Sequence, residues 1–387
     1  MTSNINIMTK KTYILSFAAL LFSIAVVFLL KETVFSEKQS PITPVNNVIP
    51  TTPENNINKM DTIIELSPKE LHYDAILVDT HNDFVYQVYY RGAKFGRDNG
   101  GTQSDLPKFK EGGLDVQVFS AWIPMSKVRK SYSFAVEQID RLHSFEQEYP
   151  DEIEFANNYE DVMRIVGEGK ICGMIGIEGG TVVGNDLDNI NSLYNMGVRY
   201  IGLTWNNSNN IGSSARDETE RGIAGGLTDF GVQVIHRMDE VGMLIDVSHL
   251  GEATFWDVIE TSKNPIIASH SNSYSVYPHY RNLTDEQIKA IAKSGGVVQV
   301  NFHQSFLGEA SLQRVFEHID HIKKLVGVDY IGIGSDFDGG INPPYELSDV
   351  TMYPNLTYKL LEEGYSQEDV RKILGLNFLR VFKQVCG

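Results

Sequence analysis

Residue types that bind divalent metals stand at the ends of several apolar runs in this sequence. The first run, Ile76-Leu77-Val78, leads into Asp79-Thr80-His81-Asn82-Asp83. Because residues i and i+2 of an extended chain point the same way, the His81 imidazole and the Asp83 carboxylate leave this strand side by side. An isolated His-x-Asp is a weak signal for a metal, but the pattern of an apolar strand followed by a ligand recurs downstream.

Four further apolar runs end in residues of the same kind. Glu178 closes the run 171–178, His249 closes 243–249, His270 closes 265–270, and Asp336 and Asp338 follow 330–335. Charged side chains are seldom buried unless they are paired or bound to a metal. We therefore predict a metal site formed by His81, Asp83, Glu178, His249 and His270.

The number of ligands indicates two metals. Five groups, of which one carboxylate bridges, describe two ions a few ångströms apart, an arrangement that traps a hydroxide and stabilises a hydrolytic transition state. Mixed histidine and carboxylate ligands with open positions suit catalytic Zn²⁺, and Mn²⁺ or Co²⁺ are the alternatives. Asp336, outside this set, is well placed to carry a proton.

The elements that must position these residues form a repeating pattern. Most of the strand candidates are continuous apolar runs, as expected of strands buried on both faces. They alternate with helical patterns such as Leu312 to Val326, and Thr284 to Gln287 forms a capping box. The eight predicted strands are 76–81, 114–121, 171–178, 198–205, 243–249, 265–270, 295–302 and 330–335.

Eight such repeats predict an α/β fold, a (β/α)₈ TIM barrel, whose chemistry lies at the carboxyl ends of the strands. A doubly wound open sheet is the alternative. It would usually carry a glycine-rich phosphate turn after its first strand, where this chain has His81 and Asp83.

Composition narrows the class of protein. The chain has 387 residues, is 42% hydrophobic and carries a formal charge of −17. This charge excludes nucleic acid as a partner, because the phosphates would be repelled. The two cysteines, Cys172 and Cys386, stand far apart and form neither a disulfide framework nor a structural zinc motif.

The N-terminal region is predicted to lie outside the barrel. Lys10 and Lys11 precede Tyr13 to Leu30, an uncharged apolar run near the lower limit for crossing a bilayer, roughly 17 residues. We predict an uncleaved membrane anchor in residues 1–31, a flexible linker in 32–65 and a catalytic domain in 66–387. The protein would then be a single-pass cell-membrane protein with its catalytic domain outside the cytoplasm. If the segment is instead a cleaved signal peptide, the protein is secreted or periplasmic.

The sequence resembles the membrane (renal) dipeptidases, zinc peptidases of the amidohydrolase superfamily, over nearly all of residues 72–383. Many motifs in the same order are far more specific than any one of them. They include Val78-Asp79-Thr80-His81-Asn82-Asp83, Asp105-Leu106-Pro107, Ile177-Glu178-Gly179-Gly180, Leu244-Ile245-Asp246-Val247-Ser248-His249, Ser269-His270-Ser271, Arg281-Asn282 and Gly334-Ser335-Asp336-Phe337-Asp338-Gly339.

The resemblance implies a role for each matched position. His81 and Asp83 would bind one zinc, His249 and His270 the other, and Glu178 would bridge them. Asp336 would be the acid/base residue beside a metal-bridging hydroxide. Arg281 would hold the terminal carboxylate of the substrate, although without the resemblance it reads as a surface arginine in a loop.

The resemblance also implies an activity and partners. It implies a metallo-dipeptidase, a hydrolase acting on peptide bonds, whose substrates are dipeptides, including some with a D-residue at the C-terminal side. The expected partners are a small peptide substrate, the membrane through the N-terminal segment, and a second copy of the chain in a homodimer.

One departure from the family pattern concerns the end of the fourth strand. Many members have Leu-Thr-His there, whereas this chain has Leu203-Thr204-Trp205. The histidine is thought to contact the substrate carbonyl, and Trp205 offers only an indole N–H. Asn206, with Asn207 or Asn210, could contact the substrate instead, or Trp205 could simply pack at the barrel mouth.

Two other functions therefore stay open beside the dipeptidase. One is a different amidohydrolase-type reaction on N-acyl amino acids, lactones or lactams at the same metals. The other is a membrane-tethered peptide-binding protein in which Trp205 blocks turnover.

Overall fold

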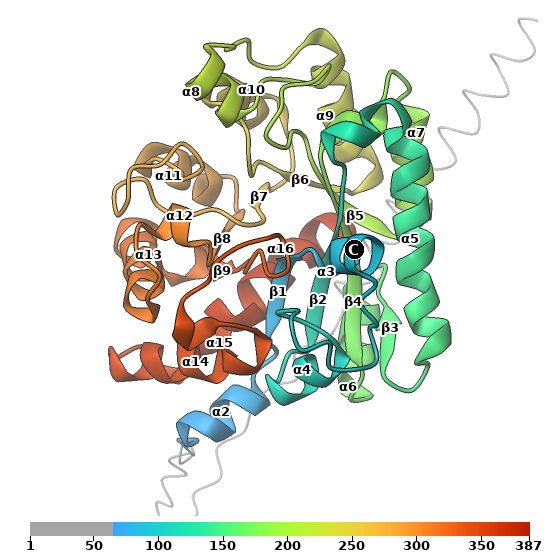
Figure 1. Ribbon diagram of the computed structural model, residues 1–387. Helices are drawn as coiled ribbons and strands as arrows, with labels where there is room; N and C mark the ends of the chain where they lie inside the picture. Colours follow the sequence, from blue (N-terminus) through green and yellow to red (C-terminus); the bar gives the residue numbers. More distant parts are fainter. Residues whose placement is uncertain (1–64) are drawn as a thin grey trace, which may run out of the picture. The chain divides into compact units, whose positions relative to one another are not determined.

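A computed structural model describes residues 65–387, which belong to one compact unit, Ile64–Gly387 (Figure 1). The predicted barrel is confirmed in this part of the chain. Eight parallel strands are hydrogen-bonded in the order β1-β2-β4-β5-β6-β7-β8-β9. The strands are β1 Val78–Asn82, β2 Val116–Trp122, β4 Ile171–Glu178, β5 Val198–Gly202, β6 Leu244–Asp246, β7 Ile267–Ala268, β8 Val297–Val300 and β9 Ile331–Ile333.

The first and last strands meet and nearly close the barrel. Asn82 forms a parallel bridge with Phe337, and the backbone N–H of Asp83 donates to the Phe337 carbonyl at 2.8 Å. The backbone N–H of Asp336 donates to the His81 carbonyl at 3.1 Å. Because both edges are joined at the carboxyl ends of β1 and β9, the alternative of a doubly wound open sheet is wrong.

One strand was not predicted. β3, Ile153–Phe155, pairs in parallel with β4 outside the barrel order. It has only three residues, and a run of that length carries no periodicity that would set it apart from a loop.

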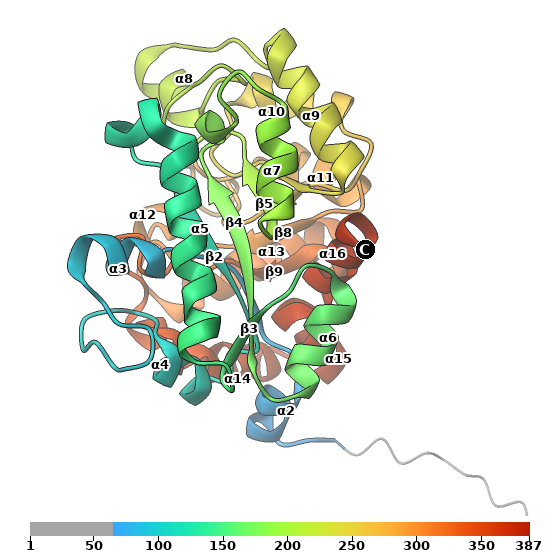
Figure 2. The same ribbon diagram turned by 90° about the vertical axis from the view of Figure 1, so that its right-hand side faces the viewer.

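Most helices lie around the barrel, and Figure 2 shows α5, α6 and α7 beside β3, β4 and β5, which they contact. The helices are α2 Pro68–Asp74, α3 Phe84–Arg91, α4 Leu106–Glu111, α5 Ser131–Glu148, α6 Tyr159–Gly167, α7 Asp188–Asn195, α8 Ala215–Arg221, α9 Asp229–Val241, α10 Glu252–Thr261, α11 Asp285–Lys293, α12 Gln304–Leu307, α13 Leu312–Val326, α14 Tyr353–Glu362, α15 Gln367–Arg371 and α16 Asn377–Cys386. Short 3₁₀ turns occur at Met125–Lys130, Gly180–Val183, Val328–Tyr330, Tyr345–Leu347 and Val350–Met352, and a π-helical turn at Lys372–Leu376 joins α15 to α16.

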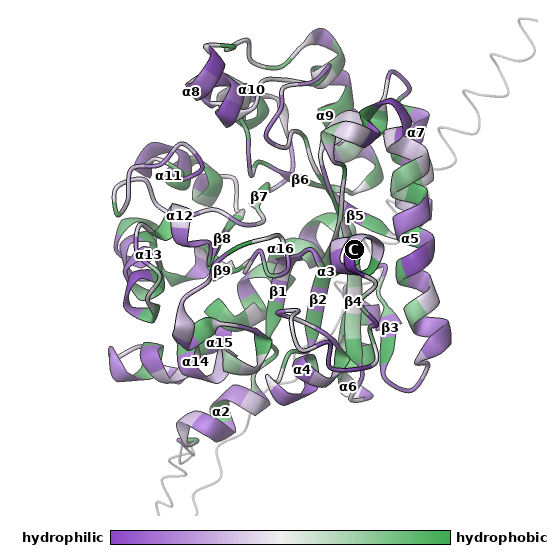
Figure 3. Ribbon diagram, viewed as in Figure 1, coloured by the Kyte–Doolittle hydropathy of each residue, from purple (hydrophilic) through white to green (hydrophobic). Residues whose placement is uncertain are grey.

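The helix signals in the sequence hold. The predicted capping box is present at the start of α11, where Thr284 and Gln287 cap one another. The predicted spacing from Leu312 gives α13, which ends at Val326. Figure 3 shows helix α5 alternating between hydrophilic and hydrophobic stretches, as a helix with one buried face should.

Helix α16 closes the end of the barrel at which the strands begin. Its apolar residues Phe378, Phe382 and Val385 share one cluster with barrel residues such as Val116 and Tyr200. Cys172 and Cys386 lie buried in the same cluster as free thiols. Since this end is filled with side chains, the opposite, C-terminal rim is left for chemistry.

The predicted location at the cell membrane requires a correction. Among the helices of residues 65–387, none is long and apolar enough to cross a membrane. The longest of these, α5, has 18 residues and includes Glu137, Asp140 and Arg141, whereas a spanning helix needs about 20 mostly apolar residues. The predicted anchor, Tyr13 to Leu30, and residues 32–64 of the predicted linker lie outside the described residues. The location as a single-pass membrane protein is therefore withdrawn.

Candidate metal centre

The residues predicted to bind metal gather at the C-terminal rim. His81 lies in β1 and Glu178 is the last residue of β4, while His249 and His270 follow β6 and β7. Two of the predicted site residues, His249 and Asp336, have positive φ angles, 70° and 67°. Non-glycine residues seldom adopt this conformation, and it is often found where a functional side chain must be aimed.

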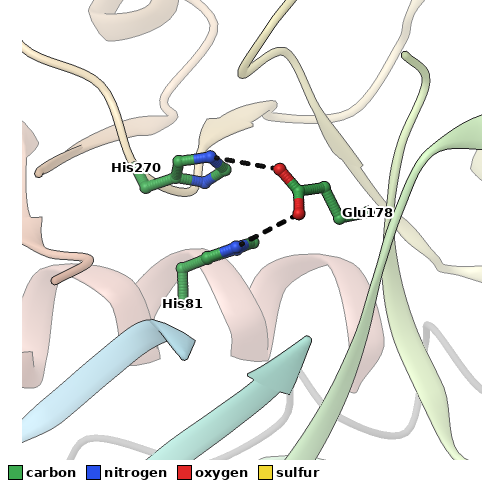
Figure 4. Close-up of side chains that lie close together, drawn as sticks. All are labelled: His81, Glu178 and His270. Atoms are coloured by element: carbon green, nitrogen blue, oxygen red, sulfur yellow. Dashed lines mark ion pairs between the residues drawn. The ribbon is translucent and has the colours of Figure 1, made fainter. Parts of the chain in front are cut away.

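Glu178 lies beside the histidines and faces them with its carboxylate, as Figure 4 shows for His81 and His270. Its Oε2 is 3.7 Å from His81 Nε2. Its Oε1 is 2.8 Å from His249 Nε2 and 3.6 Å from His270 Nε2. The two carboxylate oxygens thus face different histidines, which is the geometry of a bridging carboxylate.

Each of the three histidines presents Nε2 to the centre and uses Nδ1 for a hydrogen bond outside it. The Nδ1 partners are the Tyr200 hydroxyl for His81 at 2.9 Å, the Asn206 Oδ1 for His249 at 3.1 Å and the Ser269 Oγ for His270 at 2.7 Å. Histidine ligands of metals are normally oriented in this way by a partner on the other nitrogen.

The centre is chemically incomplete without a cation. His81 Nε2 is buried and has no hydrogen-bond partner. His249 Nε2 and His270 Nε2 lie 3.0 Å apart, and with both Nδ1 atoms carrying the proton their lone pairs would repel each other. A divalent cation between these atoms satisfies all of them, so the donor set fits metal.

Burial sets the charge of the ligands. Burial, helped by the positive charge of Arg281, lowers the pKa of His249 to about 4. Burial also holds the pKa of His270 well below its usual range. For Glu178, burial alone would raise the pKa, but the imidazoles of His249 and His81 that face its carboxylate hold it well below its usual range. His249 and His270 are thereby held as neutral imidazoles and Glu178 as an ionised carboxylate, the forms that bind metal.

Asp83 and Asp336 form a second group with His81, in which the ligand atoms lie within 4.8 Å of one another. Asp336 Oδ2 accepts a hydrogen bond from Asn301 Nδ2 at 2.9 Å. Burial raises the pKa of Asp336 to about 7. A carboxyl group with a pKa near neutrality can both take and return a proton.

A cavity of about 540 Å³ opens beside this centre. Its lining includes Asp83, Glu178, His249 and Asp336 together with the three predicted substrate-binding residues, Arg281, Trp205 and Asn206. Trp205 packs edge-on against Trp122, with ring centroids 5.0 Å apart. Asn206 accepts from His249, so its amide is engaged with a ligand as well as facing the cavity.

The sequence reasoning missed the residues that support the ligands. Tyr200, Ser269 and Asp246 are buried and contact the ligands or each other. Their only signal in the sequence was a polar residue within a strand that is otherwise apolar, as Asp246 is in Leu244-Ile245-Asp246-Val247. Tyr200 reaches His81 across 119 residues, a contact that no local pattern encodes.

Comparisons with known proteins identify the family of this chain. The sequence profile of the family described as "Membrane dipeptidase (Peptidase family M19)" matches residues 67–386. An uncharacterized dipeptidase, C965.12, of Schizosaccharomyces pombe is 35% identical over 340 residues, which make up 82% of this chain and 82% of that protein.

Two solved structures are similar throughout the barrel. The metallopeptidase dipeptidase AC is 28% identical with a TM-score of 0.76, and the match covers 81% of this chain and 99% of that one. A metallopeptidase of Rhodobacter sphaeroides, solved with a phosphinate mimic of the dipeptide L-Ala-D-Ala, is 27% identical with a TM-score of 0.75. That match covers 81% of this chain and 100% of the other. The chain therefore belongs to the membrane dipeptidase family, peptidase family M19, and is a metallo-dipeptidase, a hydrolase acting on peptide bonds.

Proposed function

We propose that this dipeptidase works with two zinc ions. His81 and Asp83 would hold one ion, His249 and His270 the other, and Glu178 would bridge them. The observation that carries the proposal is the position of Glu178, whose two oxygens face different histidines at 3.7 and 2.8 Å. When bound, two such ions activate a water molecule and polarise the carbonyl of the scissile peptide bond.

Asp336 is the proton carrier in this proposal. Its carboxyl group borders the cavity beside His81 and Asp83, and its raised pKa suits general acid–base work. It takes a proton from the attacking water, whose oxygen forms the new bond to the carbonyl carbon. It then gives the proton to the amide nitrogen as the C–N bond breaks, so that the amine leaves neutral.

Arg281 is the anchor for the C-terminal carboxylate of the dipeptide. It is only 4% exposed, and its Nε is buried without a hydrogen-bond partner. Its Nη2 donates to the His270 carbonyl at 3.3 Å, and its guanidinium lies 5.3 Å from the centre of the Phe306 ring. A guanidinium held in place on one side and unsatisfied on the other suits a planar carboxylate.

A D-residue at the C-terminal side belongs to the proposed substrate class. The structure of the Rhodobacter sphaeroides relative contains a mimic of L-Ala-D-Ala. The match covers the whole length of that relative. We therefore propose that the present protein hydrolyses both L,L- and L,D-dipeptides.

The second candidate is hydrolysis of another amide, lactone or lactam, and Trp205 is the observation that favours it. This indole borders the cavity where many relatives have a histidine, and it packs on Trp122 instead of offering a charged donor. A donor to the developing oxyanion is worth a few kcal/mol, about 3–4, so its absence would slow the usual reaction. The variant Trp205→His measures that effect.

The test is hydrolysis of a small panel of L,L- and L,D-dipeptides by the full-length chain, metal-free and then with zinc. Glu178→Ala is the inactive control, and N-acyl amino acids and lactones complete the panel. Zinc-dependent cleavage of dipeptides is the expected result. If zinc binds but only the acyl amino acids or lactones are cleaved, the second candidate replaces the first.

A further inference from the structure

We infer that Asp246, acting through Ser269, is a positioning residue that keeps the proton of His270 on Nδ1 and its Nε2 free for metal. The inference rests on the proposed metal centre and adds to it a determinant of metal affinity. Asp246 is the last residue of β6, and Ser269 follows β7, the neighbouring strand of the barrel. Both residues are buried.

The hydrogen bonds of Asp246 occupy both of its oxygens. Oδ1 accepts from the backbone N–H groups of Ser248 at 3.0 Å and Ser269 at 2.8 Å. Oδ2 accepts from the Ser269 hydroxyl at 2.7 Å. The two N–H donors hold the orientation of the carboxylate, so that one oxygen always faces the hydroxyl of Ser269.

The direction of these bonds sets the tautomer of His270. Ser269 Oγ lies 2.7 Å from His270 Nδ1. A hydroxyl has one proton, and the Ser269 hydroxyl uses it to donate a hydrogen bond to the Asp246 carboxylate. The Ser269 oxygen can therefore only accept from the ring, which requires the proton on Nδ1 and leaves the Nε2 lone pair directed at Glu178 and the metal.

The competing partner for this proton is weaker. Ser248 Oγ lies 3.4 Å from Ser269 Oγ, and it already accepts from the His270 backbone N–H at 3.1 Å. The shorter bond to a carboxylate prevails, because a hydrogen bond to a charged acceptor is the stronger one.

The three histidines differ in this respect. His249 faces an amide oxygen, and His81 faces the Tyr200 hydroxyl, which donates to the Thr80 carbonyl at 3.2 Å. These partners are neutral, and within residues 65–387 His270 alone is linked to a carboxylate through its Nδ1 partner. Asp246 should therefore control His270 without controlling the other two.

Asp246→Asn gives the sharpest test. It replaces one carboxylate oxygen by an NH₂ group and reverses the direction of the hydrogen bonds that connect residue 246, Ser269 and His270. The two backbone N–H groups hold the amide oxygen of the new side chain on their side, so its NH₂ faces Ser269. The amide then donates to Ser269 Oγ, and the hydroxyl proton turns toward His270 Nδ1. The ring must carry its own proton on Nε2, where it blocks the metal.

Asp79→Asn is the matched control for loss of a buried carboxylate. Asp79 is also fully buried on a strand of the barrel, and its carboxylate accepts from Ser335, from the Tyr353 hydroxyl at 2.7 Å and from the backbone N–H of His81 at 3.2 Å. None of these hydrogen bonds involves a ring nitrogen of His81, His249 or His270, and an asparagine oxygen can still accept from the His81 backbone. This variant therefore removes a similar charge near the metal centre. It does not reverse any hydrogen bond that leads to the ring of a proposed metal ligand.

The experiment is titration of the metal-free, full-length chain with zinc against a competing chelator. It is combined with selective ¹⁵N-histidine labelling, which distinguishes the two tautomers by NMR. Asp246→Asn should weaken zinc binding at one site by about 10–100-fold and move one histidine to the Nε2–H form. Ser269→Ala should weaken binding less, and adding Asp246→Asn to it should cause little further loss, because the connection is already broken.

Three results would overturn the inference. A loss of zinc affinity in Asp79→Asn equal to that in Asp246→Asn would assign the effect to the removed charge. Unchanged histidine tautomers in Asp246→Asn, or additive losses in the double variant, would equally contradict it. Failure of the proposed function is distinguishable from these results. In that case zinc affinity and the histidine tautomer would change in Asp246→Asn as expected, but no dipeptide would be cleaved by the wild type. Thermal unfolding of each metal-free variant identifies any that fail to fold.

Discussion

Arg281→Ala tests how the enzyme recognises its substrate. The arginine side chain donates one hydrogen bond to the His270 carbonyl and lies over the Phe306 ring, and its Nε is unsatisfied. Removing it should therefore disturb the barrel little and the substrate much. We expect a loss of kcat/KM for substrates with a free terminal carboxylate and little change for the corresponding dipeptide amides.

The magnitude follows from the hydrogen bonds that the guanidinium would make. Two bonds to a carboxylate, each about 1.5–3 kcal/mol, are together worth about 3–6 kcal/mol, which corresponds to about 10²- to 10⁴-fold in kcat/KM. Arg281→Lys keeps the charge but not the planar fork, and it should fall between the wild type and Arg281→Ala.

The assay is a cycle of two enzymes and two substrates, a dipeptide and its amide, at saturating zinc. The carboxylate and Arg281 should show a coupling free energy close to the full loss, and the zinc content should stay at the wild-type value. Equal losses for dipeptide and amide would refute the reasoning, because Arg281 would then act on the metal centre or the fold.

The remaining predictions concern catalysis, pH and packing. Asp336→Asn should lower kcat by about 10²–10⁴-fold with zinc content unchanged; loss of bound zinc would instead make Asp336 a ligand. Burial raises the pKa of Asp115 to about 6, so the folded state holds this proton more tightly and stability falls as the pH rises from 4 to 6. Asp115→Asn, which can still accept from the Leu77 backbone N–H, should stabilise the protein by at most about 3 kcal/mol at pH 8 and hardly at all at pH 4. Urea unfolding at both pH values measures this, and equal gains at both would contradict it. Phe382→Ala, at a fully buried position of α16, should cost about 3–5 kcal/mol of unfolding free energy, and a cost under about 1 kcal/mol would show that α16 does not close the barrel.

Much of the fold could be predicted because buried parallel strands have a simple signature. Apolar runs, most of them continuous, marked the eight barrel strands, and the capping box at Thr284 marked the start of a helix. Most strands in the structure are one to a few residues shorter than predicted. The apolar runs extend past the hydrogen-bonded strands into the loops at the rim of the barrel. β3 and the π-helical turn before α16 could not be predicted from the sequence, because each depends on packing against distant residues.

The gathering of the proposed metal ligands at one rim could also be predicted, since each lies at or shortly after the carboxyl end of a strand and the barrel brings these ends together. Arg281 is different. In the sequence it lies in a loop among polar residues, and only the fold buries it against His270 and Phe306. The supports of the ligands, such as Tyr200 and Ser269, depend on which strands are neighbours. Local sequence does not determine that the Tyr200 hydroxyl will meet His81.

Activity as a function of bound zinc tests the central claim most directly. The metal-free, full-length chain would be titrated with zinc while hydrolysis of one L,D-dipeptide and the amount of bound metal are both followed. If Glu178 bridges two ions, turnover should appear as the second equivalent binds, and Glu178→Gln should bind less zinc and remain inactive. Full activity with one equivalent, or two bound ions without any hydrolysis, would contradict the two-zinc dipeptidase proposed for this rim.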